Sequence, residues 1–225
     1  MLQNKKMNRL FKYLLGISTV LILIFSCTKE KSQENNQLPG VLNNQTGDCK
    51  SCTFYPWCDE STYTYVDTTA LGTTTTDYNY LFLSDTTING VDYKVTDNGA
   101  GEIVYHNCTD NNTTFLTYDF GSDLVFHTAL KESLPVGGNW LDYFPGNPIA
   151  NSTQYKITNK SITRNVNGNL FVDVTVVQER SFLDTVLVTN TNVYYARGVG
   201  EVERIVKDSA GVQLSHRILT NYRVP

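Results

Sequence analysis

The chain contains 225 residues, and its 22 acidic against 18 basic side chains give a formal net charge of −4 at pH 7. This acidic balance excludes nucleic acid as an expected partner, because phosphate backbones are bound by clustered lysines and arginines. The length suits one ordinary domain or a single large β-domain, and either can bury a proper core.

The first 26 residues have the three regions of a secretory signal peptide. Four basic residues precede an apolar run from Leu14 to Phe25, and the small residue Ser26 follows it. This run is too short to cross a bilayer as a helix, which takes about 20 residues. We therefore expect residues 1–26 to be removed on export, which takes away four positive charges and changes the formal charge from −4 to −8.

The apolar run ends in Ile24-Phe25-Ser26-Cys27, which resembles the lipobox of bacterial lipoproteins and is most similar to the looser lipoboxes of Bacteroidota. The resemblance implies that Cys27 is lipidated, palmitate included, and begins the mature chain. Two or three acyl chains hold a protein stably on a membrane, whereas one binds only marginally. We expect a lipid anchor in the cell envelope, on either face of the outer membrane. The alternative is a plain secretory peptide that leaves Cys27 as an ordinary thiol.

Residues 28–48 are mainly polar and offer almost nothing to bury. We therefore divide the mature chain into a lipidated cysteine with a flexible tether, residues 27–48, and a single β-rich domain, residues 49–225. The length requires no second domain.

Assigning Cys27 to lipid leaves an even set of four cysteines, Cys49, Cys52, Cys58 and Cys108. An exported chain enters an oxidising compartment, so we predict two structural disulfides, for which three pairings are open. The alternatives are a four-thiolate zinc site or a redox pair at Cys49 and Cys52. Both are less favoured, because the pattern lacks a second close pair and the surroundings lack a redox motif.

From Ser61 onward the chain is rich in Thr, Tyr, Val and Phe between clusters of Asn, Asp and Gly, which is typical of strands and turns. Asn89-Gly90, Asn167-Gly168 and Asp208–Gly211 favour tight hairpin turns. We predict strands over residues 62–66, 78–83, 91–96, 102–107, 114–120, 155–164, 170–182, 186–190, 193–196, 201–207 and 213–222, and one short helical turn over 128–133. The fold class is therefore all-β: a single curved antiparallel sheet or partial barrel built as a meander, with little helix outside the signal peptide.

Alternation over residues 170–177 predicts which face of that strand packs inward. The even-numbered residues are all Leu or Val, whereas the odd-numbered residues include Asp173 and Thr175. We therefore expect the even-numbered face, which begins with Leu170, to be the buried one.

Three aromatic and glycine-rich segments stand out along the domain. They are Ser61-Thr-Tyr-Thr-Tyr65, Pro135-Val-Gly-Gly-Asn-Trp140, and Tyr194-Tyr-Ala-Arg-Gly-Val-Gly200 followed by Glu-Val-Glu. Together they resemble a broad group of uncharacterised envelope lipoproteins from Bacteroidota, which share "vGxxW" and "YYaxGvGxV" patterns. Glu201 stands where that group has an apolar residue. The resemblance implies a curved antiparallel sheet or partial barrel and no established activity.

Residues 137–148 gather Trp140, Tyr143 and Phe144 in a segment punctuated by Gly and Pro. Exposed aromatic rings on a rigid loop can stack on sugars or anchor a protein, so these three residues form a candidate ligand-binding loop. The alternative is that Trp140 is a core residue, as the "vGxxW" resemblance implies, with Tyr143 and Phe144 closing its rim.

Signatures of catalysis are weak in this sequence. His106, His127 and His216 show no zinc-protease spacing, and neither a nucleophile elbow nor a phosphate loop occurs. Glu201 and Glu203 project from one face of a predicted strand, so a paired-carboxylate glycosidase is an alternative on residue types alone. We expect no catalytic residue, no metal site and no cofactor.

Four triplets consist of Asp, then Ser or Thr, then an aliphatic residue or Thr. They place Thr68, Thr86, Thr185 and Ser209 in a pattern that resembles the O-glycosylation site of exported Bacteroidota proteins. The alternative is that these triplets are turns that happen to contain Asp and Thr.

These features favour a non-catalytic binding or accessory protein of the cell envelope, which contacts the membrane through its lipid and an envelope protein or a glycan through its domain. Two other classes stay open. A secreted glycan-acting enzyme needs two carboxylates about 5 to 10 Å apart in a cleft. A carrier of an apolar lipid needs a dry internal cavity.

Overall fold

Fifteen antiparallel strands and no helix make up the residues that the computed structural model describes, which are 50–109, 112–118 and 124–225. All of them belong to one unit, Leu38–Pro225. The predicted all-β antiparallel meander is therefore confirmed over these ranges, and no helix within them is long and apolar enough to cross a membrane. The signal segment, Cys27, the tether and Cys49 lie outside the described residues.

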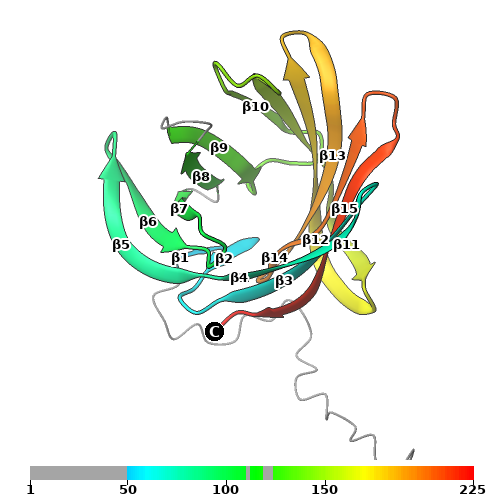
Figure 1. Cartoon of the computed structure of the whole chain (residues 1–225). Coiled ribbons are helices and arrows are strands. Elements are labelled where there is room, and N and C mark those ends of the chain that lie inside the picture. Colours follow the sequence, from blue (N-terminus) through cyan, green and yellow to red (C-terminus); the bar gives the residue numbers. More distant parts are fainter. Residues whose placement is uncertain (1–49, 110–111, 119–123) are drawn as a thin grey trace, which may run out of the picture. The chain divides into compact units, whose positions relative to one another are not determined.

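The strands form three sheets, of which the largest has the order β10-β11-β12-β13-β14-β15-β3-β4 (Figure 1). Its strands are β10 (Asn139–Tyr143), β11 (Ser152–Val166), β12 (Asn169–Leu183), β13 (Val186–Ala196), β14 (Gly200–Asp208), β15 (Gln213–Arg223), β3 (Thr62–Thr69) and β4 (Gly72–Asn79). The second sheet contains β5 (Leu81–Ile88), β6 (Val91–Asp97), β7 (Ile103–Thr109), β8 (Asn112–Tyr118) and β9 (Leu124–Lys131) in chain order. A small third sheet pairs β1 (Lys50–Cys52) with β2 (Tyr55–Trp57).

The five-stranded sheet lies in the chain between the two edge strands of the eight-stranded sheet, and neither sheet closes on itself. The chain leaves the edge strand β4 through Tyr80 and enters β5 directly afterwards. At this point the Tyr80 N–H donates to the Ser61 carbonyl at 2.9 Å, and the Tyr80 carbonyl accepts from the Glu60 N–H at 3.0 Å. The predicted strand over 78–83 was therefore wrong, because the chain changes sheets in its middle.

Two further predictions differ from the structure. Residues 128–131 belong to β9, which extends through Leu124–Lys131, and a short turn follows only at Glu132 and Ser133, where the Leu134 N–H donates to the Lys131 carbonyl at 3.2 Å. The predicted strands 186–190 and 193–196 are a single strand, β13. Most other strands lie where they were predicted, with ends that differ by a few residues; residues 119 and 120 lie outside the described ranges.

The predicted hairpin turns are confirmed. Asn89, Gly90, Asn167 and Gly168 all have positive φ, between 50° and 83°, as a two-residue turn between right-twisted strands requires. In the third turn the Asp208 carboxylate accepts the Ala210 N–H at 2.9 Å. Short-range contacts within each turn therefore support these three reversals.

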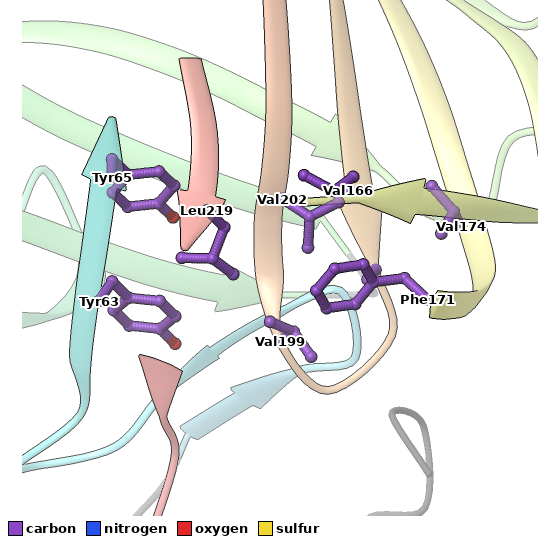
Figure 2. Packing of buried hydrophobic residues seen from close by; sticks show 9 residues of the cluster. Tyr63, Tyr65, Val166, Phe171, Val174, Val199, Val202 and Leu219 are labelled. Carbon is purple, nitrogen blue, oxygen red and sulfur yellow. The ribbon is translucent and has the colours of Figure 1, made fainter. Parts of the chain in front are cut away.

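The first core cluster brings together residues from both ends of the domain (Figure 2). Tyr63 and Tyr65 on β3 stack with their ring centroids 6.3 Å apart, and Figure 2 shows both rings on the same side of the strand, next to Leu219 of β15. The cluster consists of Tyr63, Tyr65, Val166, Phe171, Val174, Ala196, Val199, Val202 and Leu219. Burial of these apolar side chains is the main favourable contribution to the stability of this part of the fold.

The predicted facing of residues 170–177 is wrong at its start. Leu170 is 54% exposed, whereas Phe171 is fully buried. Asp173 has a φ of 52°, and the pairing of β11 with β12 shifts register nearby. Strict alternation requires a regular strand, so this irregularity exchanges the faces after Asp173. All four residues from Val174 to Val177 are buried because both faces of the strand are covered there: Val174 belongs to the first core cluster and Val177 to a second one.

Candidate functional site

A groove of about 300 Å³ lies against three strands at the β10 edge of the eight-stranded sheet. Alternation along the strands creates its polar lining: Gln154 and Lys156 flank the buried Tyr155 on β11, and Gln178 and Arg180 flank the buried Glu179 on β12. The lining residues are Gly137, Asn139, Gln154, Lys156, Gln178 and Arg180. We refer to this feature as the polar groove.

Strand register sets the spacing of these side chains. Lys156 is paired with Asn139 on one side and with Gln178 on the other, and Gln154 is paired with Arg180. Lys156 and Arg180 are therefore diagonal neighbours on adjacent strands, a relationship that separates residues by about 7 to 8 Å. The two cationic side chains thus lie within reach of one small ligand.

The polar groove contains two cations and no carboxylate. Within the described ranges, neither Lys156 nor Arg180 forms an ion pair. The Arg180 guanidinium lies 5.3 Å from the ring centroid of Phe182, and Gln178 donates a hydrogen bond to Asn190 at 3.1 Å. The charged groups of the groove are therefore available to a ligand.

Trp140, the first residue of the candidate aromatic loop, is a core residue. It is 6% exposed, its ring stacks on Tyr155, and its indole N–H donates to the Thr128 carbonyl at 2.8 Å. It belongs to a second core cluster made of Phe54, Leu130, Trp140, Tyr155, Ile157, Val177, Val193 and Tyr195. This is the alternative that the "vGxxW" pattern implied.

The two glycines before Trp140 have a physical reason. Gly137 has a φ of 90° and donates its N–H to the Ile157 carbonyl at 2.7 Å. A Cβ on Gly138 would lie 2.7 Å from the Leu134 Cβ and 2.9 Å from the Pro135 carbonyl oxygen. The segment therefore needs both glycines to lay β10 against β11.

The other two residues of the aromatic loop do not join Trp140. Tyr143 is 69% exposed at the end of β10, on the same face as Asn139 of the polar groove by strand alternation. The half-buried Phe144 lies with its ring centroid 6.3 Å from that of His127. Of the three, only Tyr143 has a largely exposed aromatic ring.

Glu201 and Glu203 are buried, and each forms an ion pair with an arginine. A β-bulge lies between them, since Tyr195 is paired with Glu201 and Tyr194 with Glu203, which makes the buried Val202 the extra residue. Glu203 accepts from Arg164 at 2.6 Å and lies 2.8 Å from His216.

Arg204 bridges two buried carboxylates. Its guanidinium lies 2.9 Å from Glu179 on β12 and 2.9 Å from Glu201 on its own strand. Burial raises the pKa of Glu179, while the adjacent Arg204 acts in the opposite direction. The single guanidinium forms ion pairs with both carboxylates, so neither is free to act as a general acid or base on a ligand.

The three histidines lie on three different strands, β7, β9 and β15. The buried His106 is 2.7 Å from the Thr96 hydroxyl, and burial lowers its pKa well below the ordinary value. His127 lies 2.9 Å from the Tyr155 hydroxyl and 3.7 Å from Asp142, and burial lowers its pKa to about 4. No group of three or more metal-binding side chains occurs in the part of the chain that the structure describes.

Cys52 and Cys108 form a disulfide that links β1 to β7 across 56 residues of sequence. Cys58 is also disulfide-bonded. Three of the four cysteines are therefore structural, as the disulfide prediction expected, and Cys49 lies outside the described residues. These three thiols form neither the zinc site nor the redox pair considered above.

The predicted O-glycosylation acceptors differ in exposure. Thr185 and Ser209 are exposed in the turns that follow β12 and β14, and Thr68 is exposed on β3. Thr86 is half-buried on β5. The carboxylates before the acceptors also have structural partners: Asp67 pairs with Arg217, and Asp184 accepts a hydrogen bond from Asn151.

The residues of the polar groove were missed in the sequence. A signal existed, because Gln154 and Lys156 alternate with Tyr155, and Gln178 and Arg180 lie two apart on the next strand. That alternation predicts an outward polar face for each strand alone. It does not reveal that the strands are adjacent in a register that groups the two cations.

No protein-family model matches the chain, and no curated protein matches it. Among solved structures, it is similar to a protein from Bacteroides fragilis designated as exported, with a YmcC-like fold, at a TM-score of 0.46 and 14% identity over 76% of this chain and 99% of the other. It is also similar to a protein from Parabacteroides distasonis designated a lipoprotein, at a TM-score of 0.42 and 14% identity over 77% of this chain and 100% of the other. Similarity at this level assigns no function.

Proposed function

We propose that the protein is a lipid-anchored component of the cell envelope that binds a ligand without chemically changing it. The observation that carries the proposal is the polar groove, which combines amide and cationic side chains with no carboxylate, hydroxyl or thiol side chain in its lining. Binding sites need a few convergent polar groups, whereas hydrolysis of a glycosidic bond needs a carboxylate pair. The polar groove has convergent polar groups and lacks a carboxylate pair.

The other classes receive less support from the same geometry. For a glycan-acting enzyme, the best carboxylate candidates were Glu201 and Glu203, and both are buried and paired with arginines. For a carrier of an apolar lipid, the site should be lined by apolar side chains, but the polar groove has none apart from the aliphatic stems of its polar residues.

Lipid anchoring at Cys27 rests on the lipobox pattern. The test is Cys27→Ser in the native cell, with the chain followed by membrane fractionation and by its mass. We expect the wild-type chain in the membrane fraction with added acyl mass, and the variant in the soluble fraction without it. A variant that stays on the membrane would overturn the anchor. Separation of inner and outer membranes, with protease shaving of whole cells, assigns the membrane and its face.

The binding role is tested by placing a photo-crosslinking amino acid at Gln154, inside the polar groove, in the full-length chain in its own cells. The matched control carries it at Thr74, an exposed position on the edge strand β4. We expect a crosslinked species from position 154 that position 74 does not give. Equal or absent crosslinking at both positions would overturn the role of the groove.

O-glycosylation is a separate proposal, supported by the four Asp-containing triplets and by the exposure of Thr68, Thr185 and Ser209. The test is the intact mass of the protein purified from its native cells, with Thr185→Ala and Ser209→Ala for comparison. We expect a mass above polypeptide plus lipid that falls in steps with each substitution. A mass equal to polypeptide plus lipid would dispose of the proposal.

A further inference from the structure

We infer that the polar groove binds an acidic glycan, with Lys156 and Arg180 contacting its anionic groups; this inference rests on the binding function proposed above. The ligand chemistry is a sugar chain that carries carboxylate or sulfate groups. The argument has three parts, which concern the arginine pairing, the amide side chains and the lack of apolar anchors in the groove.

Arg180 differs from every other arginine in the part of the chain that the structure describes. Five arginines there form ion pairs with Asp or Glu, namely Arg164, Arg197, Arg204, Arg217 and Arg223. Arg180 forms none, although acidic residues outnumber basic ones in the whole chain, 22 to 18. An unpaired arginine beside a second unpaired cation, Lys156, is therefore not explained by pairing within the protein.

The two cations can act on the same anion. They are diagonal neighbours about 7 to 8 Å apart on one face of the sheet, so an anion placed between them is attracted by both. Arginine also presents two parallel N–H donors that match a carboxylate or sulfate, whereas lysine acts as a point charge. The diagonal placement of Arg180 and Lys156 therefore offers a pair of parallel donors and a point charge. These can bind a single anionic group or two adjacent anionic groups.

The amide side chains favour a sugar over other anions. Asn139, Gln154 and Gln178 surround the cations and offer both donors and acceptors, as the hydroxyl groups of a sugar require. A volume of about 300 Å³ is at the small end for ligand sites, so the groove encloses only a short part of a longer chain. The exposed Tyr143 ring on the same face of β10 gives the rest of that chain a surface for stacking.

An acidic peptide or an anionic lipid fits less well. Peptide anchors are usually large apolar or aromatic side chains seated in pockets, and acyl chains need an apolar channel. The groove lining contains six residues, five of them with amide or cationic side chains and one glycine. Neither kind of apolar seat is therefore present in this lining.

The test measures binding of the mature chain to size-matched oligosaccharides by calorimetry at low salt. The probes are an oligogalacturonate, which carries carboxylates, a heparin oligosaccharide, which carries sulfates, and a neutral galactan oligosaccharide. We expect at least one acidic probe to bind about tenfold or more tightly than the neutral one, and its affinity to fall as salt is raised. The preferred acidic probe identifies the anionic group. Equal affinity for acidic and neutral probes would overturn the inference.

The variants Arg180→Gln and Lys156→Gln locate the site. Each should weaken binding of the preferred acidic probe about tenfold, and Arg180→Lys should recover only part of the loss because it keeps the charge without the paired donors. Arg223→Gln, a surface arginine outside the groove, should bind like wild type. Unchanged affinity in both groove variants would show that the glycan binds elsewhere. If no acidic probe binds while position 154 still crosslinks in cells, the ligand class is wrong and the binding function stands.

Discussion

Trp140 stacks on Tyr155 with the two ring centroids 5.1 Å apart and the ring planes 7° from parallel. The same indole donates its N–H to the Thr128 carbonyl on β9. One side chain on β10 therefore contacts β11 within the eight-stranded sheet and also binds the last strand of the five-stranded sheet.

The first prediction concerns this contact. Trp140→Ala should lower the free energy of unfolding by about 3 to 5 kcal/mol, because it leaves a cavity in the second core cluster. Trp140→Phe should cost less, about 1 to 3 kcal/mol, since it keeps an aromatic ring but leaves the Thr128 carbonyl without its donor. Urea unfolding followed by circular dichroism measures both. Tyr143→Ala is the control and should change stability by less than about 0.5 kcal/mol, because Tyr143 is largely exposed. A loss in Trp140→Ala no greater than in this control would contradict the prediction.

The second prediction concerns Arg204. Arg204→Met should destabilise the protein by about 3 to 5 kcal/mol at neutral pH, because it strands the buried carboxylates of Glu179 and Glu201. The deficit should shrink as the pH falls, since burial already raises the pKa of Glu179 and protonation removes its stranded charge. Arg223→Met, whose exposed partner Glu60 lies 3.8 Å away, is the control and should cost less than about 1 kcal/mol. A deficit independent of pH would show that lost packing, not stranded charge, is the cause.

The third prediction concerns His127. Burial lowers its pKa from 6.5 to about 4, with Arg204 acting in the same direction and Asp142 opposing it. The unfolded chain therefore binds the proton more readily than the folded one, so this residue makes stability fall as the pH drops from about 6.5 towards 4. Asp142 has the opposite sign, because burial raises its pKa and the folded state then holds its proton more readily.

The variant His127→Gln tests this pH dependence, because glutamine keeps a polar group near Tyr155 without titrating. Its stability should fall less steeply than that of wild type over the same range, as measured by urea unfolding at several pH values. Tyr143→Ala should keep the wild-type slope. Parallel slopes for His127→Gln and wild type would remove His127 from the acid response.

The fourth prediction concerns the disulfides. Peptide mapping without reduction should recover Cys52 linked to Cys108, and the count of cysteines makes Cys49 the expected partner of Cys58. The double variant Cys52→Ala/Cys108→Ala should lose about 4 kcal/mol, which is the loop-closure value for a separation of 56 residues. Four free thiols in the unreduced protein, or a peptide that links Cys52 to Cys58, would contradict the pairing.

Local chemistry made the turns predictable from the sequence. Asn89-Gly90 and Asn167-Gly168 tolerate positive φ better than other residue pairs, so two residues are enough to specify each reversal. Strands with alternating apolar side chains were also predictable, because the alternation is visible within the strand itself. The edge strand β4 begins with Gly72-Thr-Thr-Thr-Thr76 and carries no apolar alternation, so residues 72–77 of this strand were missed.

Other features depend on contacts between residues far apart in the sequence. The change of sheet at Tyr80 depends on backbone hydrogen bonds with Glu60 and Ser61, which no local pattern encodes. The inverted facing at Leu170 depends on the irregular backbone at Asp173. The polar groove depends on which strands are neighbours and in what register, so its cations could be identified only once the pairing of β11 with β12 was known.

The pairing of β3 with β15 has a consequence for how the chain is made. Tyr63 lies opposite Tyr222, so the first long strand of the eight-stranded sheet finds its second partner only when the last strand has been synthesised. Pairings this distant in sequence form slowly. The eight-stranded sheet therefore cannot be completed until residues 213–223 have left the ribosome.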